Sequence, residues 1–429
     1  MPISQDQALK VAQRLVRGRP VEEMTGLLAP TPAADHPPPP RVPASREWSA
    51  EAHARRVAFV RELGVDIPHL AGGAPHPDPA ALRGNVENYI GMAQVPVGLI
   101  GPLRVNGLHA RGDFYVPLAT SEGALVASHD RGAYLVTAAG GAICLTTTEQ
   151  VQRAPAFVFD SLAQAAWFAG WAVGQFEVLQ AAVGRVTAHG RLLDVATHIE
   201  GNHVYLIFAF HTGDAAGQNM VTFCTAALCE EILAGTPVQP RYWFLESNMS
   251  GDKKATALSF LQTRGRNVTA EACIPRHLVE HVLHTTPERM ADYWRVSFVG
   301  GVRTGSIGVN GHIANGIAAM FLACGQDVAC VSEASVGVTR LEVTDAGDLY
   351  AVVSLPNLIV GSVGGGTRLP TASECLRIMD CLGDGRGTKL AEICAALTLA
   401  GELSIVGALC AGEFAKAHAA LGRGAPAER

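Results

Sequence analysis

A glutamate in the segment PLATSEGALVASHDRGA (Pro117–Ala133) is a first candidate for chemistry in this sequence. Thr120 or Ser121 can cap a helix whose first turn contains Glu122, because short polar side chains accept the free N–H groups there. An acidic residue in that turn can simply complement the helix dipole. The segment is otherwise small and apolar, however, and a desolvated carboxyl group can act as a general acid. Both interpretations of Glu122 stay open at this point.

Other segments combine charged and small residues in patterns that suit ligand binding. Two lysines follow an aspartate in SNMSGDKKATALSF (Ser247–Phe260), directly before an apolar run that could be helical. In GDAAGQNM (Gly213–Met220), small residues would let the backbone approach a phosphate at a helix N-terminus. Asp327 follows an apolar helix in ACGQDVAC, and three glycines follow a strand in LIVGSVGGGTRLPT. Each pattern also has an ordinary explanation: a solubilising lysine pair, a tight turn or close backbone packing.

The elements that must position these residues are both helices and strands, which predicts an α+β fold. His418, near the end of the last helix, titrates in a useful range, although a lone histidine there is more often a surface residue. The expected helices cover Glu122–Val136, Val221–Leu233, Gly311–Cys324 and Lys389–Leu421, and the expected strands cover His203–Phe210 and Leu349–Leu355.

The chain divides by composition into three parts. Residues 1–85 predict short helices with a Pro-rich linker at 34–43, since consecutive prolines cannot enter a helix. Residues 157–244 have the size and mixed elements of a small inserted domain. The larger domain then consists of 86–156 and 245–429, and the two lysines stand where the chain returns to it.

Composition argues against several classes of protein. The 429 residues are 48% hydrophobic and 17% charged with a net charge of −6, so neither nucleic acid nor an anionic membrane is an expected partner. The longest apolar stretches fall short of the roughly 20 residues of a membrane span. Ten cysteines without a CxxC or CxxxC pair argue against structural zinc, and no other metal is expected; reduced thiols indicate the cytoplasm. Absence of GxGxxG and Walker A patterns argues against a Rossmann or P-loop nucleotide site.

In their order along the chain, these segments resemble the 3-hydroxy-3-methylglutaryl-coenzyme A (HMG-CoA) reductase family, in its class I, soluble prokaryotic form. The resemblance covers about Glu87 to Leu421. It implies a large, mainly helical acyl-CoA-binding domain around a long central helix, with an inserted small ferredoxin-like domain for the nicotinamide nucleotide. It also implies a homodimer or higher homo-oligomer with active sites between subunits. The motifs that carry it are ENYIGMAQVPVGLIGPL, PLATSEGALVASHDRGA, TGDAAGQNM, SGDKKA, GHIANGIAAMFLACGQD, GSVGGGT and LAGELSIVGALCAGEFAKAHAAL.

The family reduces HMG-CoA to mevalonate with two hydrides from NADPH or NADH, and the resemblance implies roles for matching residues. Lys253 would lie near the carbonyl oxygen on which negative charge develops. Glu122 would supply a proton in the aldehyde step, His418 would protonate the CoA thiolate, and Asp327 would couple to the lysine and the glutamate. Substrate and CoA positions fall on Arg153, Ser247, Asp252, Lys254, Asn315, Ser128 and Arg131. Nucleotide positions fall on Asp214, Gly217, Gln218, Asn219, Met220, Arg185 and Arg191.

Some positions differ from the class I pattern. Glu246 stands where a substrate-binding serine is expected, and Ser247 comes one place later. These departures leave open a related reductase that acts on a different acyl-CoA in secondary metabolism. A third interpretation is a non-catalytic acyl-CoA-binding homologue. The presence of all four catalytic residues argues against it. NADPH is favoured over NADH by cations near the expected 2′-phosphate position. Further departures are Asp130, His284, Val296 and Glu413.

Overall fold

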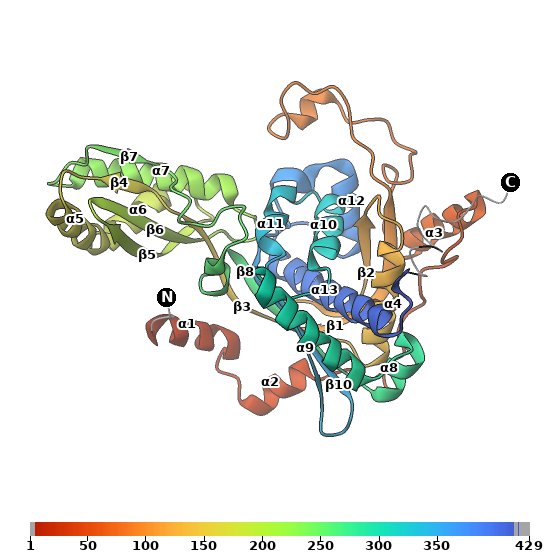
Figure 1. The fold of residues 1–429 in the computed structure, drawn as a ribbon. Coiled ribbons are helices and arrows are strands. Elements are labelled where there is room, and N and C mark those ends of the chain that lie inside the picture. The colour runs from red at the N-terminus through yellow and green to blue at the C-terminus, as the bar shows by residue number, and fades with distance from the viewer. Residues whose placement is uncertain (1–4, 416–418, 420–429) are drawn as a thin grey trace.

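A helix of 24 residues, α13 (Gly387–Cys410), lies at the centre of the larger part of the fold (Figure 1). The computed structural model describes residues 5–415 and 419. Nearly every residue of α13 is buried, because apolar and small side chains occupy all of its faces. Among the described helices it alone has the length and hydropathy of a membrane span, and 89% of its apolar window is buried inside the protein. It is therefore the long central helix that the resemblance implied.

A ten-stranded sheet runs through both parts of the fold, in the order β7-β4-β6-β3-β8-β10-β9, with β1 and β2 joined to β3 and with β5 joined to β6. The named strands pair antiparallel, except that β1 is parallel to β3. Helix α13 packs against β3, β8 and β10 of this sheet. The larger part therefore has a sheet beside its central helix, and it contains more strand than its motifs suggested. Its strands are β1 (Val97–Gly107), β2 (Arg111–Ala119), β3 (Ala142–Arg153), β8 (Gly265–Ile274), β9 (Val338–Val343) and β10 (Leu349–Leu358).

The remaining helices of the larger part surround α13 and the sheet. The α-helices are α4 (Leu125–Ala138), α8 (Arg276–Leu283), α9 (Pro287–Thr304), α10 (Ile313–Ala323), α11 (Val331–Ala334) and α12 (Pro370–Ile378). Short 3-10 helices occur at η1 (Pro79–Leu82), η2 (Ala257–Phe260), η3 (Val328–Cys330) and η4 (Gly365–Arg368).

The smaller part, at the left of Figure 1, has its own hydrophobic core. Its strands lie side by side in the order β7-β4-β6-β5. Along the chain, α5 and α6 connect β4 to β5, and α7 connects β6 to β7. This is the β-α-β-β-α-β pattern of a ferredoxin-like fold, which confirms the predicted fold class. The elements are β4 (Ala156–Val158), α5 (Leu162–Gly174), α6 (Phe176–Val186), β5 (Arg191–Glu200), β6 (His203–His211), α7 (Gln218–Gly235) and β7 (Tyr242–Phe244).

The N-terminal segment contains α1 (Gln5–Val16), α2 (Val21–Leu28) and α3 (Ala50–Glu62). Its Pro-rich stretch packs along the larger part of the fold. Arg104 donates to the carbonyl of His36 at 2.8 Å, and the Tyr115 hydroxyl donates to the carbonyl of Pro40. The stretch is therefore bound to β1 and β2 along its length, in addition to connecting helices.

Two predicted helix boundaries are wrong. Helix α4 begins at Leu125, because Ala124 is left-handed (φ 71°) and the Glu122 N–H donates to Thr120 Oγ1 at 3.0 Å, which closes a turn before the helix. Helix α13 ends at Cys410, and residues 411–413 interrupt the predicted run before residues 414 and 415 are helical again; Leu421 lies outside the described residues. Gly412 is left-handed (φ 71°), and the N–H of Glu413 donates to the carbonyl of Ala408 at 2.9 Å, as in a Schellman motif.

Candidate active site

Lys253 and Asp327 form an ion pair, with 2.7 Å between Nζ and Oδ2. The hydrogen bond that the Lys253 ammonium donates to Asp327 is the main cause that raises the pKa of Lys253, so the ammonium keeps its charge at neutral pH. Both side chains remain partly exposed, at 41% and 39%. The pair therefore presents a fixed positive charge that a substrate can reach.

The turn that carries Asp327 depends on close backbone packing. Gly325 is left-handed (φ 63°), and a Cβ atom at this position would lie 2.3 Å from the carbonyl oxygen of Gly366. Gln326 braces the turn, because its side-chain amide donates to the carbonyl of Gly361 at 3.0 Å and accepts the Gly361 N–H at 2.7 Å. One of the three consecutive glycines thus serves packing behind Asp327.

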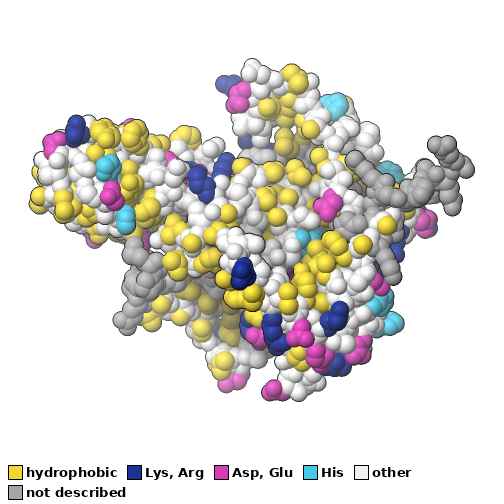
Figure 2. All heavy atoms as spheres, viewed as in Figure 1, with side chains coloured by type: hydrophobic (Ala, Val, Ile, Leu, Met, Phe, Trp, Pro, Cys, Tyr) yellow, Lys and Arg dark blue, Asp and Glu magenta, His cyan; other side chains and the backbone are white. Residues whose placement is uncertain are grey.

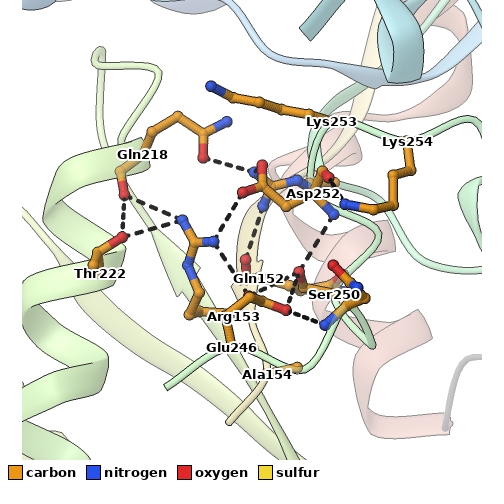
Figure 3. Close-up of polar contacts among 12 residues, drawn as sticks. Gln152, Arg153, Ala154, Gln218, Thr222, Glu246, Ser250, Asp252, Lys253 and Lys254 are labelled. Carbon is orange, nitrogen blue, oxygen red and sulfur yellow. Dashed lines mark hydrogen bonds and ion pairs between the residues drawn. The ribbon is translucent and has the colours of Figure 1, made fainter. Parts of the chain in front are cut away.

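Asp252 and Arg153 join the lysine loop to the smaller part of the fold (Figure 3). Asp252 Oδ2 lies 2.9 Å from Arg153 Nη1, and Oδ1 is paired with Arg264. Burial would raise the pKa of Asp252, but the two guanidinium groups outweigh it and hold that pKa below its usual value. Arg153 also donates to Thr222 Oγ1 on α7 at 3.1 Å. Asp252 is therefore an ionised link between the lysine loop and the helix of the smaller part.

Arg264 and Glu333 belong to the same cluster, although no motif singled them out. Arg264 lies just before β8 with 2% of its side chain exposed, and Glu333 on α11 is fully buried. Arg264 Nε lies 2.9 Å from Glu333 Oε2. The available sequence signal was weak: Glu333 is a lone charge among mainly apolar or small residues, and Arg264 is one of two arginines before a strand, although buried charges occur almost only in pairs.

Glu246, the most conspicuous departure, stabilises its own loop. Its carboxylate accepts the N–H groups of Ser247 at 3.0 Å and Asn248 at 2.7 Å. It also lies 3.2 Å from Arg153 Nη1. The hydroxyl of Ser247 donates to the Ala154 carbonyl at 2.7 Å, so it is already engaged. The change at Glu246 thus has a local explanation that requires no new substrate.

A second group of predicted residues lines one pocket: Glu122, Ser128, Arg131 and Asn315. Ser128 Oγ donates to Ser404 Oγ at 3.0 Å, and Arg131 Nη2 donates to the Ser404 carbonyl at 2.7 Å. Arg46, from the N-terminal segment, lines the same pocket and had no signal in the sequence. The pocket therefore combines a carboxyl group, an amide and two guanidinium groups.

Three charge departures near this pocket also find partners. Asp130 pairs with Arg41 at 2.5 Å, and Glu413 lies 3.0 Å from His284 and 4.0 Å from Arg131. Within the described residues, Glu122 makes no hydrogen bond or ion pair with Lys253 or Asp327. Helix α10 explains this separation, because it carries Asn315 in its first turn and Asp327 beyond its last, and its rise between 315 and 323 is about 12 Å.

Most of the predicted nucleotide residues lie around the N-terminus of α7, whereas Arg185 pairs with Glu231 near the C-terminal end of that helix. Asp214 accepts the N–H groups of Gly385 at 2.7 Å and Gly387 at 2.9 Å, so its carboxylate supports the start of α13. Gly217 is left-handed (φ 77°), where a Cβ atom would lie 2.4 Å from Thr212. Gln218 accepts from Arg264 at 2.6 Å. Met220 contacts Thr187. Asn219 and Arg191 are exposed.

The fourth predicted catalytic residue, His418, lies outside the described residues.

Comparison with known proteins identifies the family. The family model described as hydroxymethylglutaryl-coenzyme A reductase matches residues 52–423. The chain belongs to the HMG-CoA reductase family. It is 45% identical over 378 residues to the HMG-CoA reductase of Pyrococcus abyssi, covering 86% of this chain and 92% of that protein. It is 46% identical over 381 residues to the enzyme of Aeropyrum pernix, covering 87% and 90%.

A solved HMG-CoA reductase also shares the fold. The class II enzyme of Streptococcus pneumoniae, bound to NADPH in open conformations, superposes with a TM-score of 0.67 at 19% identity. The likeness covers 84% of this chain and 97% of that one. The match to the HMG-CoA reductase family model includes nearly all of α3 as well as the motifs. The Lys253–Asp327 pair and the Glu122 pocket both lie within the matched residues.

Proposed function

We infer that this protein reduces HMG-CoA to mevalonate and CoA. The observation that carries the inference, beside family membership, is the exposed Lys253 ammonium held 2.7 Å from Asp327. NADPH would supply two hydrides, one to the thioester carbonyl and one to the aldehyde. Lys253 stabilises the negative charge that develops on the carbonyl oxygen in each step, and Asp327 fixes its direction. Because the pKa of Lys253 is raised, it acts as a charge and not as a base.

Proton transfers are assigned to two other residues. His418 protonates the departing CoA thiolate after the first reduction, and Glu122 supplies the proton in the aldehyde step. Lys254, whose exposed ammonium donates to the Asp252 carbonyl at 3.0 Å, meets the carboxylate of the acyl group together with Arg153. Asp252 and Ser247 belong to the same substrate pocket and support it indirectly: Asp252 holds Arg153, and the Ser247 hydroxyl fixes the loop through the Ala154 carbonyl. Ser128, Arg131 and Asn315 line the CoA side.

We further propose that the active site is completed by a second copy of the chain. Support comes from α10, whose length holds the Asn315 end of the molecule, with Glu122, apart from the Asp327 end, with Lys253. An exposed apolar row of Val296, Val299 and Val302 follows one face of α9, at 72%, 57% and 62% exposure. Figure 2 shows hydrophobic side chains gathered on the face that carries α9. Such a face fits a homodimer or higher homo-oligomer. In that assembly Val296 would add apolar area to the subunit interface, which would explain its departure from the family pattern.

Mixing two inactive variants tests this arrangement. Glu122→Gln and Lys253→Met each remove one half of the site. If the halves come from different subunits, a mixed dimer retains one intact site, so random exchange restores about a quarter of wild-type activity. If both halves come from one subunit, no mixture regains turnover. Each variant mixed with itself is the control.

The nucleotide site is proposed at the N-terminus of α7. The free N–H groups of its first turn, the small residues 213–217 and exposed Asn219 fit a diphosphate. NADPH is the proposed cofactor, with Arg191 and Arg185 near the 2′-phosphate. Arg191→Ala should therefore raise KM for NADPH more than KM for NADH, whereas equal changes would remove Arg191 from this role. Residues 157–244 would form this nucleotide domain, with 86–156 and 245–429 as the acyl-CoA domain.

Loss of NADPH absorbance on addition of HMG-CoA tests the reaction itself. Two NADPH should be consumed for each HMG-CoA. Turnover of another 3-hydroxyacyl-CoA without turnover of HMG-CoA would contradict the assignment. A cytoplasmic location is also proposed, because all ten cysteines are free thiols and nine are buried.

A further inference from the structure

A fully buried carboxylate that the proposed reaction does not use contacts the backbone of the catalytic lysine. Glu333 Oε1 accepts the N–H of Lys253 at 3.1 Å. Lys253 itself has a left-handed backbone (φ 55°), a conformation that non-glycine residues seldom adopt unless their surroundings enforce it. The hydrogen bond from the Lys253 N–H to Glu333 therefore holds the lysine backbone in this conformation.

Arg264 extends this contact to three other elements. Beside Glu333, its guanidinium is paired with Asp252 and donates to Gln218 Oε1 at 2.6 Å and to the Gln152 carbonyl at 2.8 Å (Figure 3). These partners lie on the lysine loop, at the N-terminus of α7 and on β3. The Glu333–Arg264 pair therefore fixes the lysine loop relative to the helix that the proposed nucleotide site uses.

We propose that Glu333 and Arg264 are positioning residues that hold Lys253 in its reactive orientation, and that Glu333 performs this role only when ionised. The proposal rests on the proposed role of Lys253. As a carboxylate, Glu333 both accepts the Lys253 N–H and shares with Asp252 the balance of the buried charge of Arg264. Protonation of Glu333 leaves Asp252 alone to balance Arg264, and it weakens the hydrogen bond from the Lys253 N–H, because a neutral carboxyl oxygen is a poorer acceptor than a carboxylate.

The surroundings of Glu333 set the pH range of this effect. Burial raises the pKa of Glu333 to about 7, against the opposing influence of Arg264. The other groups that face it are the Lys253 backbone, Asp252 and Cys330, and burial raises the pKa of Cys330 to about 12, so this thiol stays neutral. Farther out, Asp327 is paired with Lys253. Glu333 is therefore ionised above about pH 7, and turnover should fall as the pH drops through that value.

Glu333→Gln tests the proposal, and Glu392→Gln is a matched control. Glu392 is also buried, also has its pKa raised to about 7 by burial, and accepts the backbone N–H groups of His109 and Ala110 away from the site. We expect Glu333→Gln to lower kcat about 10- to 100-fold, the range that a small misplacement of a reacting group produces. KM for HMG-CoA should change little. The acidic limb of the kcat–pH profile near pH 7 should disappear in Glu333→Gln and persist in Glu392→Gln.

A wild-type kcat in Glu333→Gln, or an equal loss in Glu392→Gln, would overturn the proposal. If Glu333→Gln does not fold, Glu333→Asp keeps the charge on a shorter side chain. It should lower kcat but retain the acidic limb, and absence of that limb from both Glu333→Asp and the wild type would also overturn it. Lys253→Met separates the two levels: full turnover in Lys253→Met refutes the role of the lysine, whereas loss there with normal Glu333→Gln refutes only the positioning role.

Discussion

Burial of Glu392 in the central helix should make the free energy of unfolding depend on pH. One carboxylate oxygen accepts the N–H groups of His109 at 2.9 Å and Ala110 at 2.7 Å, and the other is buried without a hydrogen-bond partner among the described residues. Burial is the main cause that raises the pKa of Glu392 from 4.5 to about 7. A glutamine in its place could keep the accepting oxygen and would carry no charge at any pH.

The expected magnitude follows from the difference between folded and unfolded pKa values. From 4.5 to about 7, at 1.36 kcal/mol for each pKa unit, the difference is about 3 kcal/mol. Because the folded pKa is the higher one, this stabilising contribution is complete below about pH 4.5. It decreases as the pH rises and is lost above about pH 7. Glu392→Gln lacks the loss, so its stability relative to the wild type should improve by about 2.5 kcal/mol between pH 5 and pH 8, because a small part of the loss has already occurred at pH 5.

Urea unfolding of both proteins at pH 5, 6, 7 and 8 measures this difference. Protein concentration must be the same throughout, because association of subunits also contributes to apparent stability. Glu333 titrates in the same range but is present in both proteins, so it cancels in the comparison. A stability difference between Glu392→Gln and the wild type that stays constant over this pH range would refute the reasoning.

Three further outcomes are expected. Lys253→Met should abolish turnover with an unchanged circular dichroism spectrum, since it removes only a charge from a partly exposed position, and near-normal kcat would contradict its role. His418→Gln should impair reduction of the thioester far more than reduction of mevaldehyde, whereas equal losses would exclude it as the thiolate donor. Gly132→Ala should destabilise the protein by about 1–3 kcal/mol or more in urea unfolding. The reason is that its Cβ atom would lie 1.9 Å from the Ala400 carbonyl oxygen, where α4 crosses α13. A wild-type unfolding midpoint would show that the two helices can move apart at no cost in free energy.

Elements with a long apolar pattern were predictable from the sequence. The run Gly311–Cys324 became α10 (Ile313–Ala323), and the strands at His203–Phe210 and Leu349–Leu355 became β6 and β10. Boundaries failed where one backbone conformation decided the outcome. Ala124 in the left-handed region moves the start of α4 past Glu122, and Gly412 ends α13 well before Leu421. Neither conformation has a periodic signal, because each is set by hydrogen bonds within a single turn.

Partners of charged residues were harder to predict than their presence. The sequence indicates Asp252 and Lys253 but not Arg264 or Glu333, which come from the edge of β8 and from α11. Those contacts exist only once the sheet and α11 are assembled, so spacing along the chain carries no information about them.

The same reasoning changes how Glu246 is interpreted. As a sequence departure it suggested a different acyl-CoA, since a substrate-binding hydroxyl was expected there. In the fold its carboxylate is held by two backbone N–H groups, by Ser250 and by Arg153. A carboxylate so engaged keeps the lysine loop in shape and pairs with the same Nη1 of Arg153 that Asp252 contacts. A substitution at a binding position therefore indicates altered specificity only when its side chain is left without partners, and that condition is not met at Glu246.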